Sequence, residues 1–463
     1  MFLLACAVPE PKAETGEVAD TEVEDTGVGD TGEAPAPPCP AVLEGERGDY
    51  AGWTLASGGD VTGDGVDDVA VSSAYSRDFG SGVYVVAGPV TGSGLLGDVA
   101  TATWISEHED DRLGASVTIG ADLDGDGVGD AILGAPYFPD TAQGTGAVYV
   151  VYGGPGLGDM SAERADVWLT GTERYEYVGF AVAAGADLDG DGIADLLTIS
   201  GGPGVVWFVP GGGLPGAANL SDVSGSEIRA AEGRGAPGAV AFAGDLDGDG
   251  AEDVILGAPA DGAEGEASAS PGAVYFLRSA DVVAGAALDE TTARLVGSSS
   301  DELLGSSLSR AGDTDGDGSA EVVLGRAIAG KQAESDVADP VRGGAWLVEG
   351  MPEGVQSVAD VGTELLGEGA DELFGEAVHG GADLDGDGLD DAFAGATGYS
   401  PDAGRVYGFF GGTRALLEGV PGDGAGTAVA SASWGGADTL LVGAGWQWEG
   451  GVVYVCGPEA FGP

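Results

Sequence analysis

Asp122-Leu-Asp-Gly-Asp-Gly-Val-Gly-Asp130 is one of six copies of an acidic nine-residue pattern in this 463-residue chain. The other copies begin at Asp60, Asp187, Asp245, Asp313 and Asp383, so that successive copies start 62, 65, 58, 68 and 70 residues apart. Each copy is followed by a short apolar run, such as Ala131-Ile-Leu133 after the second copy. Near-constant spacing of this kind predicts a repeat architecture in which every unit carries one acidic loop.

The residue types in the loop are those that calcium prefers, because calcium takes about 6–8 oxygen ligands in flexible geometry. Side chains at positions 1, 3, 5 and 9 can converge, position 7 can offer its carbonyl, and the glycines at positions 4 and 6 allow positive φ. Magnesium demands tighter octahedral geometry and is the weaker prediction. The predicted ligands are Asp60, Thr62, Asp64, Val66 and Asp68; Asp122, Asp124, Asp126, Val128 and Asp130; Asp187, Asp189, Asp191, Ile193 and Asp195; Asp245, Asp247, Asp249, Ala251 and Asp253; Asp313, Asp315, Asp317, Ser319 and Glu321; Asp383, Asp385, Asp387, Leu389 and Asp391.

The alternative is a set of turns with solvated acids and no metal ion. Two carboxylates about 4 Å apart repel by about 4 kcal/mol at an effective dielectric constant near 20. Three or four converging acids therefore need a counter-ion, and we expect about six bound Ca²⁺ ions. The neutral Thr62 makes the first loop the weakest of the six.

Strand-like runs surround every loop and predict an all-β chain. Short β-branched or aromatic runs bounded by Gly, Asp and Pro recur, such as Gly146-Ala-Val-Tyr-Val-Val-Tyr152. A seventh unit is degenerate, since Ser431-Ala-Ser-Trp-Gly-Gly436 stands where the acids should be. Seven units of about four strands predict a seven-bladed β-propeller over residues 40–463, with the calcium loops between strands.

Around the loops, Val178-Gly-Phe180, Leu373-Phe-Gly375, Leu133-Gly-Ala-Pro136 and Leu256-Gly-Ala-Pro259 resemble the FG-GAP repeats of integrin α-subunit propellers and related bacterial surface proteins. The resemblance covers about residues 41–457. It implies a seven-bladed propeller with calcium loops on one face and partner binding usually on the opposite face.

The first 39 residues differ from the repeats. Leu3-Leu-Ala-Cys6 resembles a bacterial lipobox and predicts lipidation of Cys6, the alternative being a chance cysteine in an ordinary hydrophobic start. The acidic tract from Asp20 and the segment Pro35-Ala-Pro-Pro38 predict an extended, disordered linker. We therefore expect an extracellular or envelope protein, lipid-anchored at a bacterial surface.

The chain ends are predicted to close the ring. Gly451-Val-Val-Tyr-Val455 is the last apolar strand, and Ala41-Val-Leu-Glu-Gly45 has the pattern of the outer strand that this blade lacks. Antiparallel pairing would bring Cys39 and Cys456 together, and an oxidising compartment would allow a disulfide. The alternative is two unrelated free thiols.

Composition excludes several classes of function. The net charge of −62 opposes binding to nucleic acid or anionic lipid. No Gly-x-Ser-x-Gly elbow or phosphate loop is present, and His108 and His379 are expected to be solvated or incidental. The triplet Arg47-Gly48-Asp49 is expected to be a chance match to an integrin-recognition motif.

We therefore predict a monomeric, non-catalytic propeller that binds calcium and a protein or glycan partner in adhesion. The alternatives are a secreted polysaccharide hydrolase or lyase and a structural envelope or matrix protein. Trp434, Trp446 and Trp448 could stack on sugar, although blade packing is the favoured role.

Overall fold

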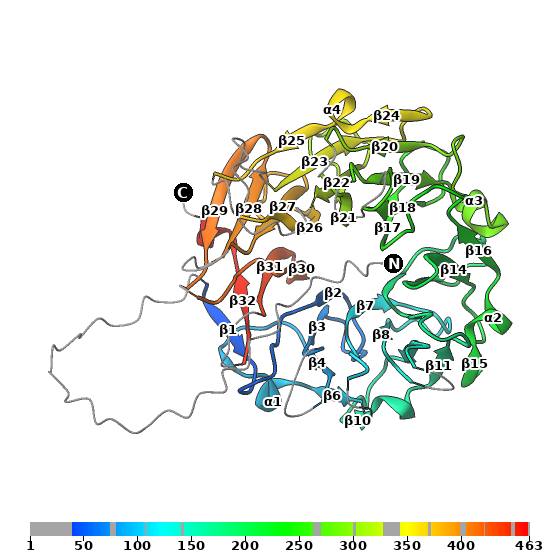
Figure 1. Cartoon of the computed structure of the whole chain (residues 1–463). Helices are drawn as coiled ribbons and strands as arrows, with labels where there is room; N and C mark the ends of the chain where they lie inside the picture. Colours follow the sequence, from blue (N-terminus) through cyan, green and yellow to red (C-terminus); the bar gives the residue numbers. More distant parts are fainter. Residues whose placement is uncertain are drawn as a thin grey trace, which may run out of the picture.

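Seven small β-sheets follow one another round a ring in the computed structural model of the chain (Figure 1). The structure describes residues 39–74, 80–106, 108, 110–139, 143–262, 270–299, 302–326, 343–368, 372–398, 404–420, 422–445 and 450–461. Its helices are single turns of three to six residues. The predicted all-β, seven-bladed propeller is confirmed.

Each blade has four antiparallel strands, numbered here from the ring centre outward. The first strands are β2 (Leu55–Gly59), β7 (Ser116–Ala121), β12 (Ala181–Ala184), β17 (Ala239–Gly244), β21 (Leu304–Gly312), β26 (Phe374–Ala382) and β30 (Ala428–Trp434). The second strands are β3 (Asp68–Ser72), β8 (Asp130–Ala135), β13 (Leu196–Ser200), β18 (Asp253–Ala258), β22 (Glu321–Arg326), β27 (Asp391–Ala396) and β31 (Ala437–Ala444). The third strands are β4 (Gly82–Val86), β9 (Ala147–Val151), β14 (Val205–Val209), β19 (Ala273–Leu277), β23 (Gly344–Glu349), β28 (Arg405–Phe410) and β32 (Val452–Cys456). The fourth strands are β6 (Ala102–Ile105), β11 (Val167–Thr170), β16 (Ser226–Arg229), β20 (Arg294–Val296), β25 (Thr363–Leu365), β29 (Thr413–Glu418) and, for blade 7, β1 (Ala41–Glu44).

Apart from the acid near their start, the second strands are largely apolar because neighbouring blades cover both of their faces. All six residues of β8 and of β18 are buried. A glycine in each of these two strands touches a glycine at the start of the next blade's first strand or just before it. A Cβ on Gly134 would lie 2.1 Å from the Gly179 carbonyl oxygen, and one on Gly257 would lie 2.1 Å from that of Gly305. Backbone contact between blades therefore explains why the second-strand glycine recurs in blades 2, 4, 5, 6 and 7, whereas Ser72 and Ile199 stand at this position in blades 1 and 3.

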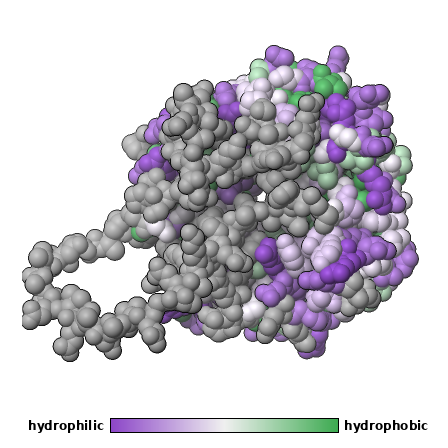
Figure 2. All heavy atoms as spheres, viewed as in Figure 1, coloured by the Kyte–Doolittle hydropathy of each residue, from purple (hydrophilic) through white to green (hydrophobic). Residues whose placement is uncertain are grey.

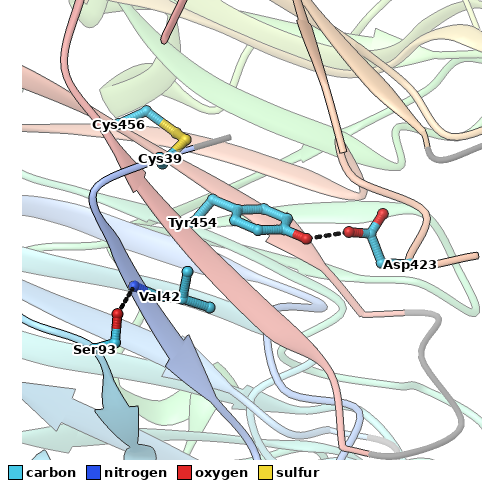
Figure 3. The surroundings of a disulfide bond; sticks show 6 residues. All are labelled: Cys39, Val42, Ser93, Asp423, Tyr454 and Cys456. Carbon is cyan, nitrogen blue, oxygen red and sulfur yellow. Dashed lines mark hydrogen bonds between the residues drawn. A yellow bond between two sulfur atoms is a disulfide. The ribbon is translucent and has the colours of Figure 1, made fainter. Parts of the chain in front are cut away.

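Blade 7 combines the two ends of the described chain. β1 pairs antiparallel with β32, in register from Ala41 opposite Val455 to Glu44 opposite Val452. A disulfide joins Cys39, just before β1, to Cys456 at the end of β32 (Figure 3). The acidic loop is replaced in this blade by a two-residue turn between β30 and β31. Gly435 and Gly436 have φ of 65° and 82°, which suits a tight hairpin of this kind.

Four very short strands add a feature that the sequence analysis did not predict. We call them rim strands: β5 (Gly94–Leu95), β10 (Met160–Ser161), β15 (Ala217–Asn219) and β24 (Val355–Ser357). Each leaves its own blade and pairs in parallel with the fourth strand of the preceding blade, as β5 does with β1 and β10 with β6.

A helical turn follows each rim strand and returns the chain to its own blade. These turns are α1 (Leu96–Val99), η1 (Ala162–Arg164), α2 (Leu220–Val223) and α4 (Val358–Val361). The connection in blade 4 has α3 (Ser279–Ala284) and touches blade 3 through a bridge between Leu288 and Ala230. The last helical turn is η2 (Pro458–Phe461). The rim elements thus tie neighbouring blades together at the outside of the ring.

Candidate functional site

The six acidic loops connect the first and second strands of blades 1 to 6, and the first aspartate organises each of them. In the second loop, Asp122 Oδ1 accepts hydrogen bonds from the amides of Gly125 (2.7 Å) and Asp126 (3.0 Å), and its Oδ2 accepts from Gly127 (2.9 Å). Gly125 and Gly127 have φ of 79° and 91°, which L side chains rarely adopt. The same bonds recur in the loops that start at Asp187, Asp245 and Asp383.

The carboxylates at positions 1, 3 and 9 converge in five of the six loops. In each group, one oxygen from every residue lies within 4.8 Å of the others, a spacing that could hold a metal ion. The acid at position 9 begins the second strand, which buries it at the floor of the site; Asp130 and Asp391 are 0% exposed. The groups are Asp122, Asp124 and Asp130; Asp187, Asp189 and Asp195; Asp245, Asp247 and Asp253; Asp313, Asp315 and Glu321; Asp383, Asp385 and Asp391.

The predicted ligands at position 5 do not belong to these groups. In the second loop, Asp126 Oδ1 instead accepts a hydrogen bond from the Val128 amide at 2.9 Å. The first loop forms no group of three acids among the described residues, because Thr62 stands at position 3 and donates its hydroxyl to Asp60 Oδ1 at 3.4 Å. Metal binding by the first loop, by position 5 and by the carbonyls at position 7 stays a prediction.

Carboxylate oxygens that are buried without a hydrogen-bond donor indicate whether a cation would fit the loops. Asp253 Oδ1, Glu321 Oε1 and Asp391 Oδ1 are buried and have no hydrogen-bond donor. In the first three loops the equivalent oxygen is satisfied by a glycine amide after the third strand, at 3.2 Å for Asp68, 2.9 Å for Asp130 and 3.0 Å for Asp195. A buried, unpaired carboxylate oxygen is costly. A cation in the fourth, fifth and sixth loops would compensate it.

Burial shifts the pKa of the acids at position 9. Desolvation, reinforced by the neighbouring loop carboxylates, raises the pKa of Asp391 to about 7 and that of Asp253 to about 6. The same two causes raise the pKa of Asp130 to about 6, against opposition from the Gly153 and Leu123 amides. A bound cation must therefore displace protons from these acids near neutral pH.

This competition predicts opposite pH dependences with and without calcium. Without calcium, the folded-state pKa of Asp391 lies above its unfolded value, so the folded protein binds the proton more tightly. The contribution of this group to stability then increases as pH falls from 8 toward 5. With saturating calcium, acidification over the same range should weaken ion binding and lower the melting temperature. Melting curves at pH 8, 6.5 and 5, in calcium and in chelator, measure both trends; curves with the same slope would contradict the prediction.

The fourth loop differs because an arginine already forms an ion pair with one of its acids. Arg278 Nε lies 2.5 Å from Asp247 Oδ2, at position 3. Arg278 follows β19 directly, one residue before Ser279, which stands where glycine donates its amide in the first three blades. The arginine therefore competes with a metal ion for this oxygen.

Replacing Arg278 with alanine should strengthen calcium binding to the fourth loop. Half of the Arg278 side chain is exposed, at 56%, so the ion pair is screened and the expected gain in affinity is about twofold to fivefold. Titration calorimetry on R278A and on R229A, a matched control whose arginine pairs with Glu227 outside the loops, would measure the change. Equal affinities in both variants would refute the competition.

Backbone hydrogen bonds connect neighbouring loops at three of the five junctions between them. The amide at position 8 of one loop donates to the carbonyl at position 1 of the preceding loop: Gly129 to Asp60 at 2.9 Å, Ala194 to Asp122 at 3.2 Å and Asp390 to Asp313 at 2.9 Å. Asp438 of blade 7 extends the series, since its Oδ2 accepts from the Asp383 amide at 2.9 Å. Ordering one loop therefore helps to order the next.

Other residues singled out in the sequence have structural roles. Asp49 is 2% exposed and accepts a hydrogen bond from Tyr84 OH at 2.7 Å, so the Arg47-Gly48-Asp49 triplet does not present its carboxylate to a partner. His379, which was expected to be solvated or incidental, is only partly exposed. Its Nε2 lies 2.8 Å from Ser431 Oγ of blade 7, and burial lowers its pKa to about 4.

Trp434 donates its indole N–H to the Asp67 carbonyl oxygen at 2.8 Å, which joins blades 7 and 1. This contact agrees with the packing role that was favoured for it. Cys6, Trp446 and Trp448 lie outside the described residues.

The fold and its loops define a class: a β-propeller with acidic inter-strand loops. The sequence model for the FG-GAP repeat matches residues 113–151, which contain the second loop and its flanking strands. The chain is similar to Integrin alpha-PS2 of Drosophila melanogaster, with 34% identity over 161 residues, or 32% of this chain and 11% of that protein. It is also similar to Integrin alpha pat-2 of Caenorhabditis briggsae, with 31% identity over 33% of this chain and 13% of that protein.

The chain is thus a β-propeller with an FG-GAP repeat at residues 113–151, and it resembles the integrin α subunits. The matched segment spans little more than a tenth of the length of these integrins. Among solved structures, BBS1N in a complex with ARL6DN aligns with a TM-score of 0.49 and 11% identity, covering 89% of this chain and 96% of that one. The Dos1 propeller aligns with a TM-score of 0.46 and 11% identity, covering 88% and 81%.

Proposed function

We propose that this chain is a calcium-dependent adhesion or binding propeller of the cell surface or extracellular space, without catalytic activity. The similarity to integrin α subunits supports a binding role at a cell surface. Our proposal adds that the acidic loops bind about six Ca²⁺ ions and that the calcium-loaded ring holds a protein or glycan partner.

The observation that carries the proposal is the convergence of three carboxylates in each of five loops. All predicted loop residues are proposed as ligands, including the position-7 carbonyls and the first loop. Calcium would supply charge neutralisation and would fix the loops in one conformation. The partner would then bind to a propeller that keeps the same conformation.

The surface is consistent with a binding role. On the face shown in Figure 2, hydrophilic residues dominate the coloured surface. The large apolar side chains that are exposed, among the described residues, lie on the rim: Leu95, Val99, Ile105, Val355 and Val361. Figure 2 shows apolar surface near the top, where α4 and β24 lie in Figure 1.

No helix within the described residues is long and apolar enough to cross a membrane. We propose that residues 1–39 form a linker and that a lipid on Cys6 anchors the propeller of residues 40–463. Mass spectrometry of the protein from its native membrane fraction would show a diacylglyceryl mass on a peptide beginning at Cys6. An unmodified Cys6 would refute the anchor.

Binding assays test the function directly. The full chain, in 2 mM calcium and in chelator, is applied to a glycan array and to a panel of extracellular matrix proteins. We expect saturable binding that needs calcium and is weakened by Asp124→Asn, while Asp98→Asn on α1 leaves it unchanged. Turnover of a polysaccharide on the array would support the hydrolase alternative and would overturn the non-catalytic proposal.

A further inference from the structure

On the outer edges of blades 7, 1, 2 and 4, a backbone amide that points away from the sheet bonds to the next blade. It belongs to the fourth-strand residue opposite the Tyr near the middle of the third strand. These residues are Val42 opposite Tyr454, Thr103 opposite Tyr84, Trp168 opposite Tyr149 and Arg294 opposite Tyr275. An amide at this position needs an acceptor from beyond the sheet.

The next blade supplies that acceptor, always from the residue just before its rim strand. Val42 N donates to Ser93 Oγ at 3.0 Å (Figure 3), and Thr103 N donates to Asp159 Oδ1 at 2.9 Å. Trp168 N donates to the Gly216 carbonyl oxygen at 3.0 Å, and Arg294 N to that of Gly354 at 2.8 Å. Rim strands β5, β10, β15 and β24 begin immediately after these acceptors.

No described residue pairs with the outer edges of β25 and β29. The rim strand for β25 would have to come from blade 6. In that blade the third and fourth strands are joined by the tight turn Gly411-Gly412, which leaves no room for a rim strand. The equivalent outward amides are those of Glu364, opposite Trp346, and of Leu416, opposite Tyr407.

For β29 the reason is topological. Its rim strand should come from the connection between the third and fourth strands of blade 7, which are β32 and β1. That connection is divided between the two ends of the chain, because β32 ends at Cys456 and β1 begins at Ala41. The chain that follows β32, which forms η2 and contacts β29, and the chain that precedes β1 therefore share the topological position of β5, β10, β15 and β24.

The N-terminal sequence carries the pattern of the rim elements. After three of the rim strands the chain reads Leu96-Gly-Asp-Val99, Leu220-Ser-Asp-Val223 and Val358-Ala-Asp-Val361, and the first residue of each is at most 1% exposed. The N-terminal segment contains Val18-Ala-Asp-Thr21, Val23-Glu-Asp-Thr26 and Val28-Gly-Asp-Thr31. Each has a β-branched apolar residue, an acid two positions later and then a β-branched residue.

The length of chain is sufficient. From the first residue of the helical turn to the start of the fourth strand takes six positions in blade 1 (Leu96 to Ala102) and five in blade 5 (Val358 to Thr363). Thirteen positions separate Val28 from Ala41.

We propose that the chain's own N-terminal segment, residues 25–31, lies along β29 as a fifth rim strand. Val28 takes the place of Leu96, and Asp25, three residues before it, accepts the Leu416 amide as Asp159 accepts that of Thr103. The segment would complete the rim beside the ring closure and fix where the N-terminal linker leaves the propeller. The inference is independent of calcium binding and of the partner, and it shortens the free part of the proposed linker to the residues before Asp25.

Amide hydrogen exchange of the full-length protein, resolved at single residues by electron-transfer fragmentation, tests the docking. The test variant replaces Val18, Val23 and Val28 with aspartate, because all three copies of the pattern are similar. The matched control adds the same charge outside the pattern, as Ala13→Asp, Ala34→Asp and Ala36→Asp. Glu364 on β25 is the internal reference, because its amide has no acceptor among the residues that the structure describes.

We expect the Leu416 amide to exchange at least tenfold more slowly than that of Glu364 in the wild type and in the control. In the triple-valine variant it should become as fast as Glu364, while Val42 and Trp168 stay protected. Equal rates for Leu416 and Glu364 in the wild type, or protection unaffected by the valine substitutions, would overturn the proposal. Protection that grows with protein concentration together with a dimer mass would assign the segment to a second copy and overturn docking within one chain.

Discussion

Removing calcium with a chelator should lower the melting temperature of this protein by on the order of 10 °C. At a free calcium concentration ten times the dissociation constant, one site contributes about 1.4 kcal/mol by mass action. Six independent sites would contribute about 8 kcal/mol, comparable with the stability of a whole domain of about 5–15 kcal/mol. For a chain of this size, an entropy of unfolding of about 2.1 cal/mol/K per residue converts that loss into roughly 10 °C.

Three comparisons separate ion binding from a general effect of the chelator. Calcium added back in excess should restore the melting temperature, and magnesium at the same concentration should restore less. Asp124→Asn should reduce the number of bound ions in native mass spectrometry by about one, whereas Asp98→Asn on α1 should not change it. A melting temperature unaffected by chelator, with no calcium retained by the native protein, would contradict both the ligand assignment and the proposed function.

The sequence predicts the architecture well because the decisive residues are local and repeated. A loop such as residues 122–130 contains its own turn glycines, its own capping aspartate and the acid that starts the next strand. The structure needs no distant residue to form the hydrogen bonds from Gly125 and Gly127 to Asp122. Six copies of this loop indicate six blades, and the seventh blade is recognised from its apolar strands alone.

The rim strands could not be predicted in this way. Two or three residues, as in β5 and β10, have no alternation to detect, and their partners lie on another blade. Arg278 is a similar case, since nothing local to residues 245–253 indicates that a guanidinium after β19 reaches Asp247. The contact between His379 and Ser431 likewise joins residues that lie 52 positions apart on neighbouring blades.

The acids that precede the first strands include contacts that the repeat pattern predicts and one that it cannot predict. Asp49 accepts from Tyr84 OH and Glu372 from Tyr407 OH, each at 2.7 Å, and so they join the entry loop of a blade to its third strand. In blade 4 the equivalent approach, Arg234-Gly-Ala-Pro237, contains no acid. Asp261, from the loop after β18, accepts the Tyr275 hydroxyl instead at 2.6 Å. The interaction is thus preserved although the acid comes from another segment, which a repeat alignment cannot detect.

Loss of the bond between Cys39 and Cys456 should be the second large destabilisation. The two cysteines are 417 residues apart, so the bond makes nearly the whole propeller one closed loop. The chain-entropy model gives about 6 kcal/mol for a loop of this length, and measured values are often lower. Four residue pairs between β1 and β32 hold the last blade together. Opening this blade exposes the apolar edges of blades 1 and 6. We therefore expect C39A/C456A to melt on the order of 5 °C below the wild type in calcium.

The controls distinguish closure of the ring from loss of two buried side chains. Cys39 and Cys456 are 5% and 0% exposed, so alanine also removes some packing. A reductant leaves both side chains in place and should produce most of the same decrease in the wild type, but none in C39A/C456A. Amide exchange should rise first in β1 and β32 and only later in β14 on the far side of the ring, because the ring opens at its closing blade. Free thiols at both positions in protein from its native compartment, or identical melting of oxidised and reduced protein, would show that β1 holds the ring closed without the bond.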